Sequence, residues 1–191
     1  MLSAYSDCLI AFFTSTPEGK NFSCADMDLI ISKFNCVTFK NNEEFCGQNK
    51  ICGEVGIIYS GIFKAESTYA NGEKKIRAMF FEPYNSVVVD CYSFENGVVS
   101  NQRIVSRIES TLLVISKYNL NYLSRTFPDF GIIMRNMLTK SCEAHKLILM
   151  EYEQLSPLQK RQKFDACFAH VIDDLTREEK AFLTGAGKNI F

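Results

Sequence analysis

Residues 53–81 read "GEVGIIYSGIFKAESTYANGEKKIRAMFF", and this stretch decides the fold. Apolar and β-branched residues dominate it, and glycines interrupt it at close intervals. Asn71-Gly72 separates two β-rich runs, and an Asn-Gly pair in that position is the strongest short signal for a β-hairpin. The stretch therefore predicts antiparallel strands joined by tight turns.

Short β-rich runs lie on both sides of this stretch, between about residues 35 and 115. The runs are "CVTFK", "VGIIYSGIFKAEST", "KKIRAMFF", "SVVVDCY", "RIVSRI" and "STLLVI", and the turn signals between them are "NNEE", "CGQNKICGE", "YANGEK", "EPYN" and "ENGVVSN". Many short strands at this spacing indicate an antiparallel barrel or jelly roll rather than a βαβ fold. We predict a double-stranded β-helix, or jelly roll, of about eight strands.

The segments on either side of the roll carry apolar residues at helical spacing of three or four. The expected helices cover residues 2–13, a segment from Ser23, "NLNYLSRTF" (119–127), a long segment from Pro128 to about 150, residues 157–172 and residues 176–183. Ser23 with Asp26 three residues later forms a near capping box. The fold class is therefore α+β, with flanking helices, one long helix and a small helical C-terminal tail.

The 191 residues have ordinary globular composition, with 47% hydrophobic residues, 23% charged residues and a net charge of −1. This balance gives no chain-wide attraction to nucleic acid or to an anionic membrane. No stretch approaches the roughly 18 apolar residues of a membrane span. The N-terminal apolar run is too short for a signal segment and lacks basic residues before it. We expect a cytoplasmic protein with no membrane partner.

Eight cysteines lie mostly in apolar stretches and form no CxxC motif; they are Cys8, Cys24, Cys36, Cys46, Cys52, Cys91, Cys142 and Cys167. The chain is large enough to form a hydrophobic core without disulfide bonds, so we expect mostly buried, reduced thiols. His145 and His170 are the only histidines, and neither has metal-ligand spacing to a cysteine pair. We predict no metal, no cofactor, no catalytic residues and no enzymatic activity.

This order of elements, with the quoted stretch and the following "FFEPYNSVVVD", resembles the cyclic-nucleotide-binding domain of the catabolite-activator (Crp/Fnr) family of bacterial transcription regulators. The segment "YLSRTFPDFGIIMRNMLTK" (122–140) resembles the stretch that leads into that family's dimerisation helix. The segment "QLSPLQKRQKFDACF" (154–168) resembles its C-terminal domain. The resemblance spans about residues 25–191.

The resemblance implies three parts and a homodimer. Residues 1–127 would form a cyclic-nucleotide-binding-like β-roll domain with N-terminal helices. Residues 128–152 would form a dimerisation helix, and residues 153–191 a partial winged-helix or helix-turn-helix domain. A transcription regulator of the Crp/Fnr type would use the roll to sense an effector and the C-terminal domain to read DNA.

The expected effector site departs from the family's pattern. Members that bind cyclic nucleotides neutralise the phosphate with the arginine of an Arg-Ser or Arg-Ala pair, and the resemblance places Ser100-Asn101 at that pair. Arg103 lies three residues further, and an odd offset in a strand points to the opposite face. A buried phosphate would then be an unpaired charge, so we do not expect tight cyclic AMP binding.

Two interpretations of the pocket segment stay open. In the first, the roll binds an unidentified small ligand through Asp90, Cys91, Ser93, Ser100 and Asn101. In the second, which we favour, these are ordinary turn residues and the roll is filled by its own side chains. The apolar residues before Cys91 favour an inert thiol over a redox sensor. An ion pair of Asp90 with Arg107 is favoured on the surface rather than in a pocket.

Residues 129–150 carry an apolar stripe that is longer than one side of a small roll would cover. We predict a seam between two copies of this helix rather than a helix packed wholly on its own roll. The residues assigned to the dimer helix are Phe130, Met134, Met137, Leu138, Ser141, His145 and Ile148. We expect His145 to be a partly exposed spectator rather than a pH-sensitive group.

Residues 175–191 read "LTREEKAFLTGAGKNIF" and fit the first helix and turn of a helix-turn-helix. Thr176 is the expected N-cap, and the recognition helix would start near Lys188, which leaves it only four residues. The remnant of the DNA-binding surface is Thr184, Gly185, Lys188 and Asn189. Eight acidic residues offset eight basic residues from Lys140 to Phe191, whereas a DNA-binding domain carries a basic footprint.

Two functional hypotheses follow. The first is a Crp/Fnr-like transcriptional regulator that lacks tight cyclic AMP binding and complete DNA reading. The second is a ligand-sensing or protein-interaction dimer with no DNA-binding activity. In both, the partner is a second copy of the chain. DNA binding is expected to be weak or absent.

Overall fold

Eight strands form two four-stranded antiparallel sheets, with strand orders β1-β8-β3-β6 and β2-β7-β4-β5. The computed structural model describes residues 2–191, with side chains from Ala4 onward. The strands are β1 (Asn35–Phe39), β2 (Glu44–Cys46), β3 (Glu54–Ser60), β4 (Phe63–Thr68), β5 (Lys74–Phe80), β6 (Val87–Val88), β7 (Arg103–Ser106) and β8 (Ser110–Ser116). The predicted jelly roll of about eight strands is confirmed.

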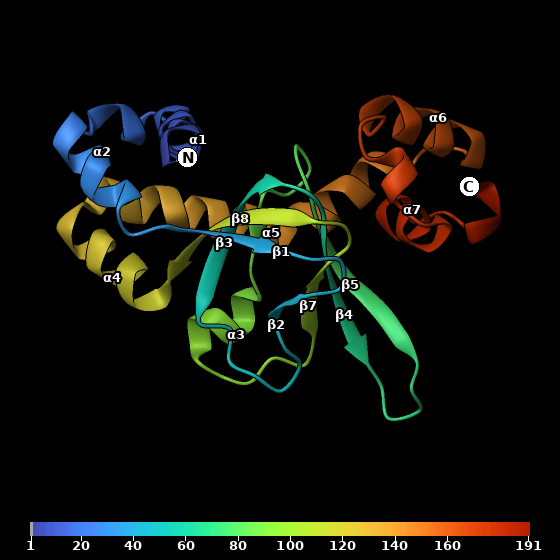
Figure 1. Ribbon diagram of the computed structural model, residues 1–191. Helices are drawn as coiled ribbons and strands as arrows, with labels where there is room; N and C mark the ends of the chain where they lie inside the picture. The colour runs from blue at the N-terminus through green and yellow to red at the C-terminus, as the bar shows by residue number, and fades with distance from the viewer. Residues whose placement is uncertain (1) are drawn as a thin grey trace.

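Seven α-helices and three 3₁₀-helices complete the described chain. They are α1 (Leu2–Thr14), η1 (Glu18–Asn21), α2 (Cys24–Ile31), α3 (Cys91–Asn96), α4 (Lys117–Thr126), α5 (Pro128–Tyr152), α6 (Pro157–Cys167), η2 (Ile172–Asp174), α7 (Arg177–Thr184) and η3 (Lys188–Ile190). Figure 1 shows α1, α2 and α4 at one end of the roll and α6 and α7 at the other, with α5 running between the two ends. None of the described helices is long and apolar enough to cross a membrane.

The hairpin predicted from Asn71-Gly72 joins β4 to β5. The Tyr69 N–H donates to the Glu73 carbonyl oxygen over 2.9 Å and closes the loop. Gly72 has φ 82°, a left-handed conformation that glycine adopts without steric cost. Local turn chemistry therefore fixes this pair of strands.

Three strand boundaries differ from the sequence prediction. The run "VGIIYSGIFKAEST" forms two strands, because Gly61 turns the chain with φ 98° between β3 and β4. A Cβ atom there would lie 2.1 Å from Ser110 Oγ, so only glycine fits. In "SVVVDCY" only Val87–Val88 is a strand, and β2 lies where turns were expected.

The helix caps follow the sequence closely. The Ser23 and Asp26 capping box opens α2, and a second capping box, of Thr176 with Glu179, opens α7. Pro128 occupies the first turn of α5, where a missing N–H costs nothing. The helix expected over 157–172 ends at Cys167, where the ring of Phe168 packs on Phe164 with ring centroids 5.0 Å apart.

Two separate hydrophobic clusters fill the molecule. The first, which we call the roll core, lies between the two sheets and extends to α1, α2, α3, α4 and the first half of α5; among its fully buried members are Phe13, Ile30, Val55, Phe63, Ile104, Leu112 and Phe130. The second, which we call the C-terminal core, consists of Ile62, Met79, Phe81, Ile148, Tyr152, Phe164, Phe168, Val171, Leu175 and Leu183.

Neighbouring residues at the start of β4 and at the end of β5 face different cores. Phe63 belongs to the roll core, whereas Ile62 beside it belongs to the C-terminal core. Phe80 points inward, and Met79 and Phe81 on either side of it point to the C-terminal helices. Successive side chains in a strand face opposite sides, so the outer face of this sheet carries the C-terminal segment.

Candidate functional site

A short helix follows β6 at the mouth of the roll. Asp90 is the N-cap of α3, and its Oδ1 accepts from the Ser93 N–H over 3.2 Å. Gly97 ends the helix with φ 67°. The sequence had suggested a strand and a turn here, and that prediction was wrong because an Asp N-cap and a Gly C-cap together favour a helical turn.

Polar side chains behind α3 satisfy one another. Asp90 Oδ2 accepts from Ser100 Oγ over 2.5 Å. Ser93 Oγ donates to the Val98 carbonyl oxygen over 2.6 Å and accepts from the Cys52 N–H over 2.9 Å. All three polar side chains are buried. This network holds the loop after α3 against the roll, which is a structural use of Asp90, Ser93 and Ser100.

A cavity of about 240 Å³ opens on the other side of Asp90 and Cys91, between the roll, α3 and α5. We call it the roll-mouth cavity; its lining is Arg77, Ala78, Phe80, Val89, Asp90, Cys91, Tyr92, Gln102, Ser141 and Cys142. Two of the five pocket residues predicted from the sequence, Asp90 and Cys91, line it. Asn101 lies exposed outside this lining.

Arg77 is a cavity residue that the sequence reasoning missed. It lies on β5, and its Nε donates to Ser67 Oγ over 3.1 Å while a guanidinium nitrogen donates to the Tyr69 hydroxyl over 2.7 Å. It therefore brings one positive charge to the roll-mouth cavity from a different strand than the family pattern suggested. The signal available was a single charged residue within the apolar half of "KKIRAMFF".

Cys91 and Cys142 form a disulfide across 51 residues of sequence, with Cα atoms 6.6 Å apart. The prediction of an inert, reduced Cys91 was therefore wrong. The remaining six cysteines are free, and three of them, Cys24, Cys36 and Cys167, are exposed rather than buried. Flanking apolar residues did not reveal the pair because the partner comes from α5, which only the fold brings to α3.

The suggested pairing of Asp90 with Arg107 is also absent. Arg107 Nε instead donates to Glu179 Oε1 of α7 over 2.6 Å. Lys64 lies 3.0 Å from Glu66 and 3.7 Å from Glu179, so it joins two buried carboxylates. These ion pairs connect the outer face of the roll to α7 beside the C-terminal core.

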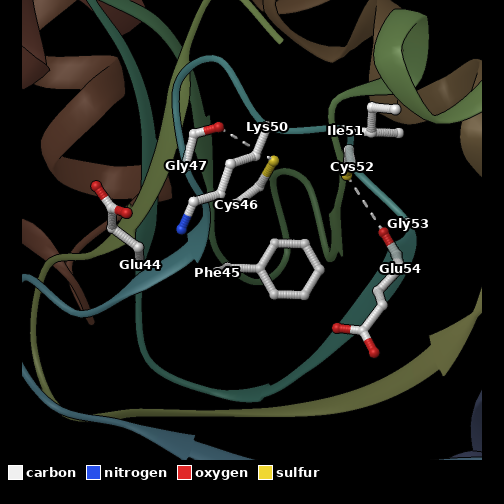
Figure 2. Close-up of a pocket in the computed structure, with 9 residues that line it drawn as sticks. All are labelled: Glu44, Phe45, Cys46, Gly47, Lys50, Ile51, Cys52, Gly53 and Glu54. Carbon is white, nitrogen blue, oxygen red and sulfur yellow. Dashed lines mark hydrogen bonds between the residues drawn. The ribbon is translucent and has the colours of Figure 1, made fainter. Parts of the chain in front are cut away.

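A second pocket, of about 300 Å³, lies beside the β2–β3 connection and is drawn in Figure 2. Cys46 Sγ donates to the Gly47 carbonyl oxygen over 3.8 Å. Cys52 Sγ donates to the Glu54 carbonyl oxygen over 3.4 Å. A hydrogen bond between the two thiols raises the pKa of Cys46 and lowers the pKa of Cys52. Among the described residues, no three His, Cys, Asp or Glu side chains gather as metal ligands.

The stripe predicted on α5 is largely covered by the chain itself. Phe130, Met134, Leu138 and Ile148 are buried in the single chain. Met137 is half-buried, and Ser141 Oγ donates to the Val87 carbonyl oxygen over 2.8 Å. The apolar side chains left open on α5 are Ile132, Leu147 and Met150, which are 41%, 49% and 59% exposed. A partner helix can therefore contact these residues, not the four buried ones.

His145 lies against the C-terminal segment rather than in a seam. Its ring stacks on Phe182 of α7 with centroids 3.9 Å apart and an interplanar angle of 5°. Burial lowers the pKa of His145, and its Nδ1 is buried without a hydrogen-bond partner. The neutral ring is thus the form that this position favours.

The four residues predicted as a DNA-binding remnant are placed at and after the end of α7. Thr184 is buried and donates to the Lys180 carbonyl oxygen over 2.9 Å, and Gly185 ends α7 with φ 62°. Lys188 pairs with Glu178 over 3.1 Å, and Asn189 is exposed. A groove of about 630 Å³ between α5, α6 and the end of α7 includes Gly185 and Thr184 in its lining.

Comparison with known proteins gives structural matches only. No protein-family model matches the sequence, and no curated protein matches it significantly. The catabolite activator protein of Thermus thermophilus superposes with a TM-score of 0.54 at 15% identity, covering 92% of this chain and 83% of that one. A putative Crp/Fnr-family transcriptional regulator from Eubacterium rectale gives 0.59 at 13% identity, over 92% and 82% of the two chains.

A cyclic-nucleotide-binding domain from Methylobacillus flagellatus superposes with a TM-score of 0.61 at 16% identity, over 80% of this chain and 86% of that one. At such identities these matches establish the fold. The chain therefore has a Crp/Fnr-like fold, in which a β-roll like that of cyclic-nucleotide-binding domains is followed by a long helix and a C-terminal helical segment.

Proposed function

We propose that this chain is a Crp/Fnr-like regulator whose roll senses an effector other than a tightly bound cyclic nucleotide. The observation that carries the proposal is the extent of the match, since 92% of the chain follows two proteins described as a catabolite activator and a transcriptional regulator. A match confined to the roll would have supported a sensor module alone. The proposal assigns no catalytic activity to the chain.

In this proposal residues 1–127 form the effector domain, residues 128–152 the helix that pairs two copies, and residues 153–191 the output segment. The exposed residues Ile132, Leu147 and Met150 on α5 support a homodimer, because apolar side chains left open along one helix gain from burial against a second copy. Sedimentation equilibrium of the chain measures this state directly, and a monomer at all accessible concentrations would contradict it.

Three features of the roll-mouth cavity argue against tight cyclic AMP binding. Its volume of about 240 Å³ lies below the roughly 300–1,000 Å³ of pockets that enclose a small ligand. The Asp90 carboxylate lines it and opposes a phosphate. Arg77, the cavity's one arginine, already donates to Ser67 and Tyr69.

Calorimetric titration with cyclic AMP and cyclic GMP tests this part of the proposal. We expect no binding in the sub-micromolar range for either nucleotide. The thermal unfolding transition of the same sample, followed by circular dichroism, is the control that the protein is folded. A sub-micromolar dissociation constant would overturn the conclusion.

DNA binding is expected to be weak, because residues 140–191 carry no net positive charge. The eight basic residues between Lys140 and Phe191 are offset by eight acidic ones, and the Lys188 ammonium is paired with Glu178. Counterion release would therefore contribute little to affinity. Gel shifts on random duplex DNA at increasing salt test this, and tight binding with a steep salt dependence would contradict it.

The same pairing of Lys188 favours a second candidate function, a ligand-sensing or protein-interaction dimer with no DNA-binding activity. Asp173 and Asp174 in η2 add negative charge to the same segment. The two candidates differ in one measurement. A sequence-selective complex on the promoter of the chain's own gene supports the regulator, and a stable dimer that binds no DNA supports the second candidate.

A further inference from the structure

The Cys91–Cys142 bond lies at the rim of the roll-mouth cavity, and both cysteines belong to its lining. It joins the first residue of α3 to the middle of α5, two elements that approach each other only in the fold. We propose that this bond is a reversible redox switch, which when oxidised ties α3 covalently to α5 and when reduced leaves α3 held by its contacts with the roll.

The environment of the pair favours reversibility. Cys142 is exposed and Cys91 half-buried, so the bond joins two residues near the surface rather than two residues of a core. Accessible disulfides are the labile and regulatory ones, whereas buried structural disulfides resist reduction.

The other cysteines give the contrast. Cys46 and Cys52 are buried and interact through their thiols, yet they stay free, as do Cys8, Cys24, Cys36 and Cys167. A small domain held together by disulfides pairs most of its cysteines, whereas this chain has one disulfide and six free thiols. In a protein whose thiols stay mostly reduced, a single disulfide is usually transient and redox-sensing.

Hydrogen bonds are available to both α3 and α5 when the disulfide is reduced. Cys91 Sγ lies 3.8 Å from the Leu138 carbonyl oxygen, which can accept from the reduced thiol. Ser141 Oγ donates to the Val87 carbonyl oxygen over 2.8 Å, and this contact keeps α5 on β6 without the disulfide. Phe94 of α3 is buried in the roll core, and Ser93 keeps its hydrogen bonds to Val98 and Cys52. Reduction therefore loosens α3 from α5 and not from the roll.

The chemistry balances with a low-molecular-weight disulfide such as oxidised glutathione. The thiolate of one cysteine attacks a glutathione sulfur, which forms a mixed disulfide and releases one glutathione thiolate. The thiolate of the other cysteine then attacks the cysteine sulfur of the mixed disulfide, which closes the Cys91–Cys142 bond and releases the second glutathione. The two cysteine protons end on the two released thiols, and an excess of reduced glutathione runs the sequence backward.

The test uses the full chain equilibrated in buffers of defined reduced-to-oxidised glutathione ratio, quenched by alkylation and read by mass spectrometry. We expect Cys91 and Cys142 to become protected together, with a linked peptide in the unreduced digest. The exposed thiols of Cys24 and Cys167 are internal controls that stay open to alkylation or carry only glutathione. Full alkylation of Cys91 and Cys142 at every ratio would overturn the proposal.

Hydrogen exchange of the oxidised and reduced protein tests what the bond controls. Amides of residues 91–102 are expected to exchange about tenfold faster after reduction. The reason is that the covalent bond to α5 then no longer opposes local opening of α3. Amides in the β6-facing part of α5 should not change. Equal exchange of residues 91–102 in the two states would overturn the switch even if the bond forms.

Matched variants complete the design. Cys91→Ser and Cys142→Ser should each show the exchange pattern of the reduced protein under oxidising conditions, and Cys24→Ser should behave as the unaltered chain. If either variant fails to fold, hydrogen exchange of the unaltered protein in its oxidised and reduced states still tests the proposal. The inference does not depend on the proposed regulatory function, because both readouts concern the chain itself and neither involves DNA.

Discussion

The roll core and the C-terminal core lie on opposite faces of β5, yet they are held in different ways. The roll core is closed by apolar side chains from two sheets and five helices. The C-terminal core seats one helical segment on the outside of a sheet, and buried ion pairs run beside it, with Arg107 Nε 2.6 Å and Lys64 Nζ 3.7 Å from Glu179 Oε1. Packing of the C-terminal segment on the sheet therefore depends on ion pairs, whereas the enclosed roll core is held by apolar packing.

The largest expected effect separates the two cores by one matched pair of substitutions. Phe63 and Phe164 are both 0% exposed, in the roll core and the C-terminal core respectively. Phe63→Ala should lower the free energy of unfolding of the whole chain by about 3–5 kcal/mol, through lost burial and the cavity left behind. Chemical denaturation measures it.

Phe164→Ala removes the same side chain, but it should act first on residues 153–191. Hydrogen exchange should rise there while the central strands β3 and β8 stay protected. If Phe164→Ala exposed β3 and β8 to exchange as fully as Phe63→Ala does, the two cores would be one cooperative unit and the distinction would fail.

The next effect is acid sensitivity through Glu66, which lies among the ion pairs beside the C-terminal core. Burial alone would raise its pKa, but hydrogen bonds from Arg103 and Lys64 outweigh burial and lower the pKa from 4.5 to about 2. The folded state therefore gains stability above about pH 4.5 and loses it as the pH falls toward 2, by about 3 kcal/mol.

Denaturation between pH 5 and 2 measures this loss, and Glu66→Gln is the control that lacks the titrating group. The variant should be less stable than the unaltered chain at pH 6, and the gap should narrow as the pH falls. A constant difference across this range would show that Glu66 does not carry the acid dependence.

A smaller, local effect is expected from Glu179→Gln. The substitution keeps the size of the side chain but removes the charge that faces Arg107, and a hydrogen bond to a charged group contributes about 1.5–3 kcal/mol. Residues of α7 should exchange faster, and the roll should not. Thr176→Ser, which retains the N-cap hydroxyl of α7, is a suitable control. Faster exchange throughout the roll would show that the ion pairs of Glu179 stabilise the roll itself and not only the packing of α7 on it.

The smallest effect is expected at the exposed edge of the C-terminal segment. The Lys188–Glu178 pair has side chains that are 65% and 56% exposed. Such surface pairs contribute roughly 0–1 kcal/mol. Lys188→Ala should therefore leave thermal unfolding nearly unchanged, and DNA affinity as well. A large loss of DNA affinity would restore Lys188 as a DNA-reading residue.

Sequence patterns recovered most of the secondary structure, because caps, turns and periodicity act over a few residues. The Asn71-Gly72 hairpin and the Ser23 capping box are examples of such local chemistry. The apolar stripe of α5 was also visible, but its partner was not. An amphipathic pattern says that a face is buried and not which surface buries it, so Phe130, Met134, Leu138 and Ile148 gave no means of distinguishing a second copy from the chain's own cores.

The candidate site was only partly predictable for a related reason. Asp90 and Cys91 were found because they follow an apolar strand at the roll mouth, whereas Arg77 and Cys142 enter the same cavity from β5 and α5. The run "AMFF" did contain one unused clue. A continuous apolar run in a strand indicates burial on both faces, and Met79 and Phe81 indeed face the C-terminal core while Phe80 faces the roll core.

The sequence by itself determined where most helices begin and where the β4–β5 hairpin turns, since caps and turns depend on neighbouring residues, and the spacing of the short strands indicated a roll. Tertiary structure alone decided that Cys91 meets Cys142 across 51 residues and that Arg107 meets Glu179 across 72. The physical reason is that a bond or an ion pair needs its atoms within a few ångströms, and for distant residues that proximity follows from how the sheets and helices pack.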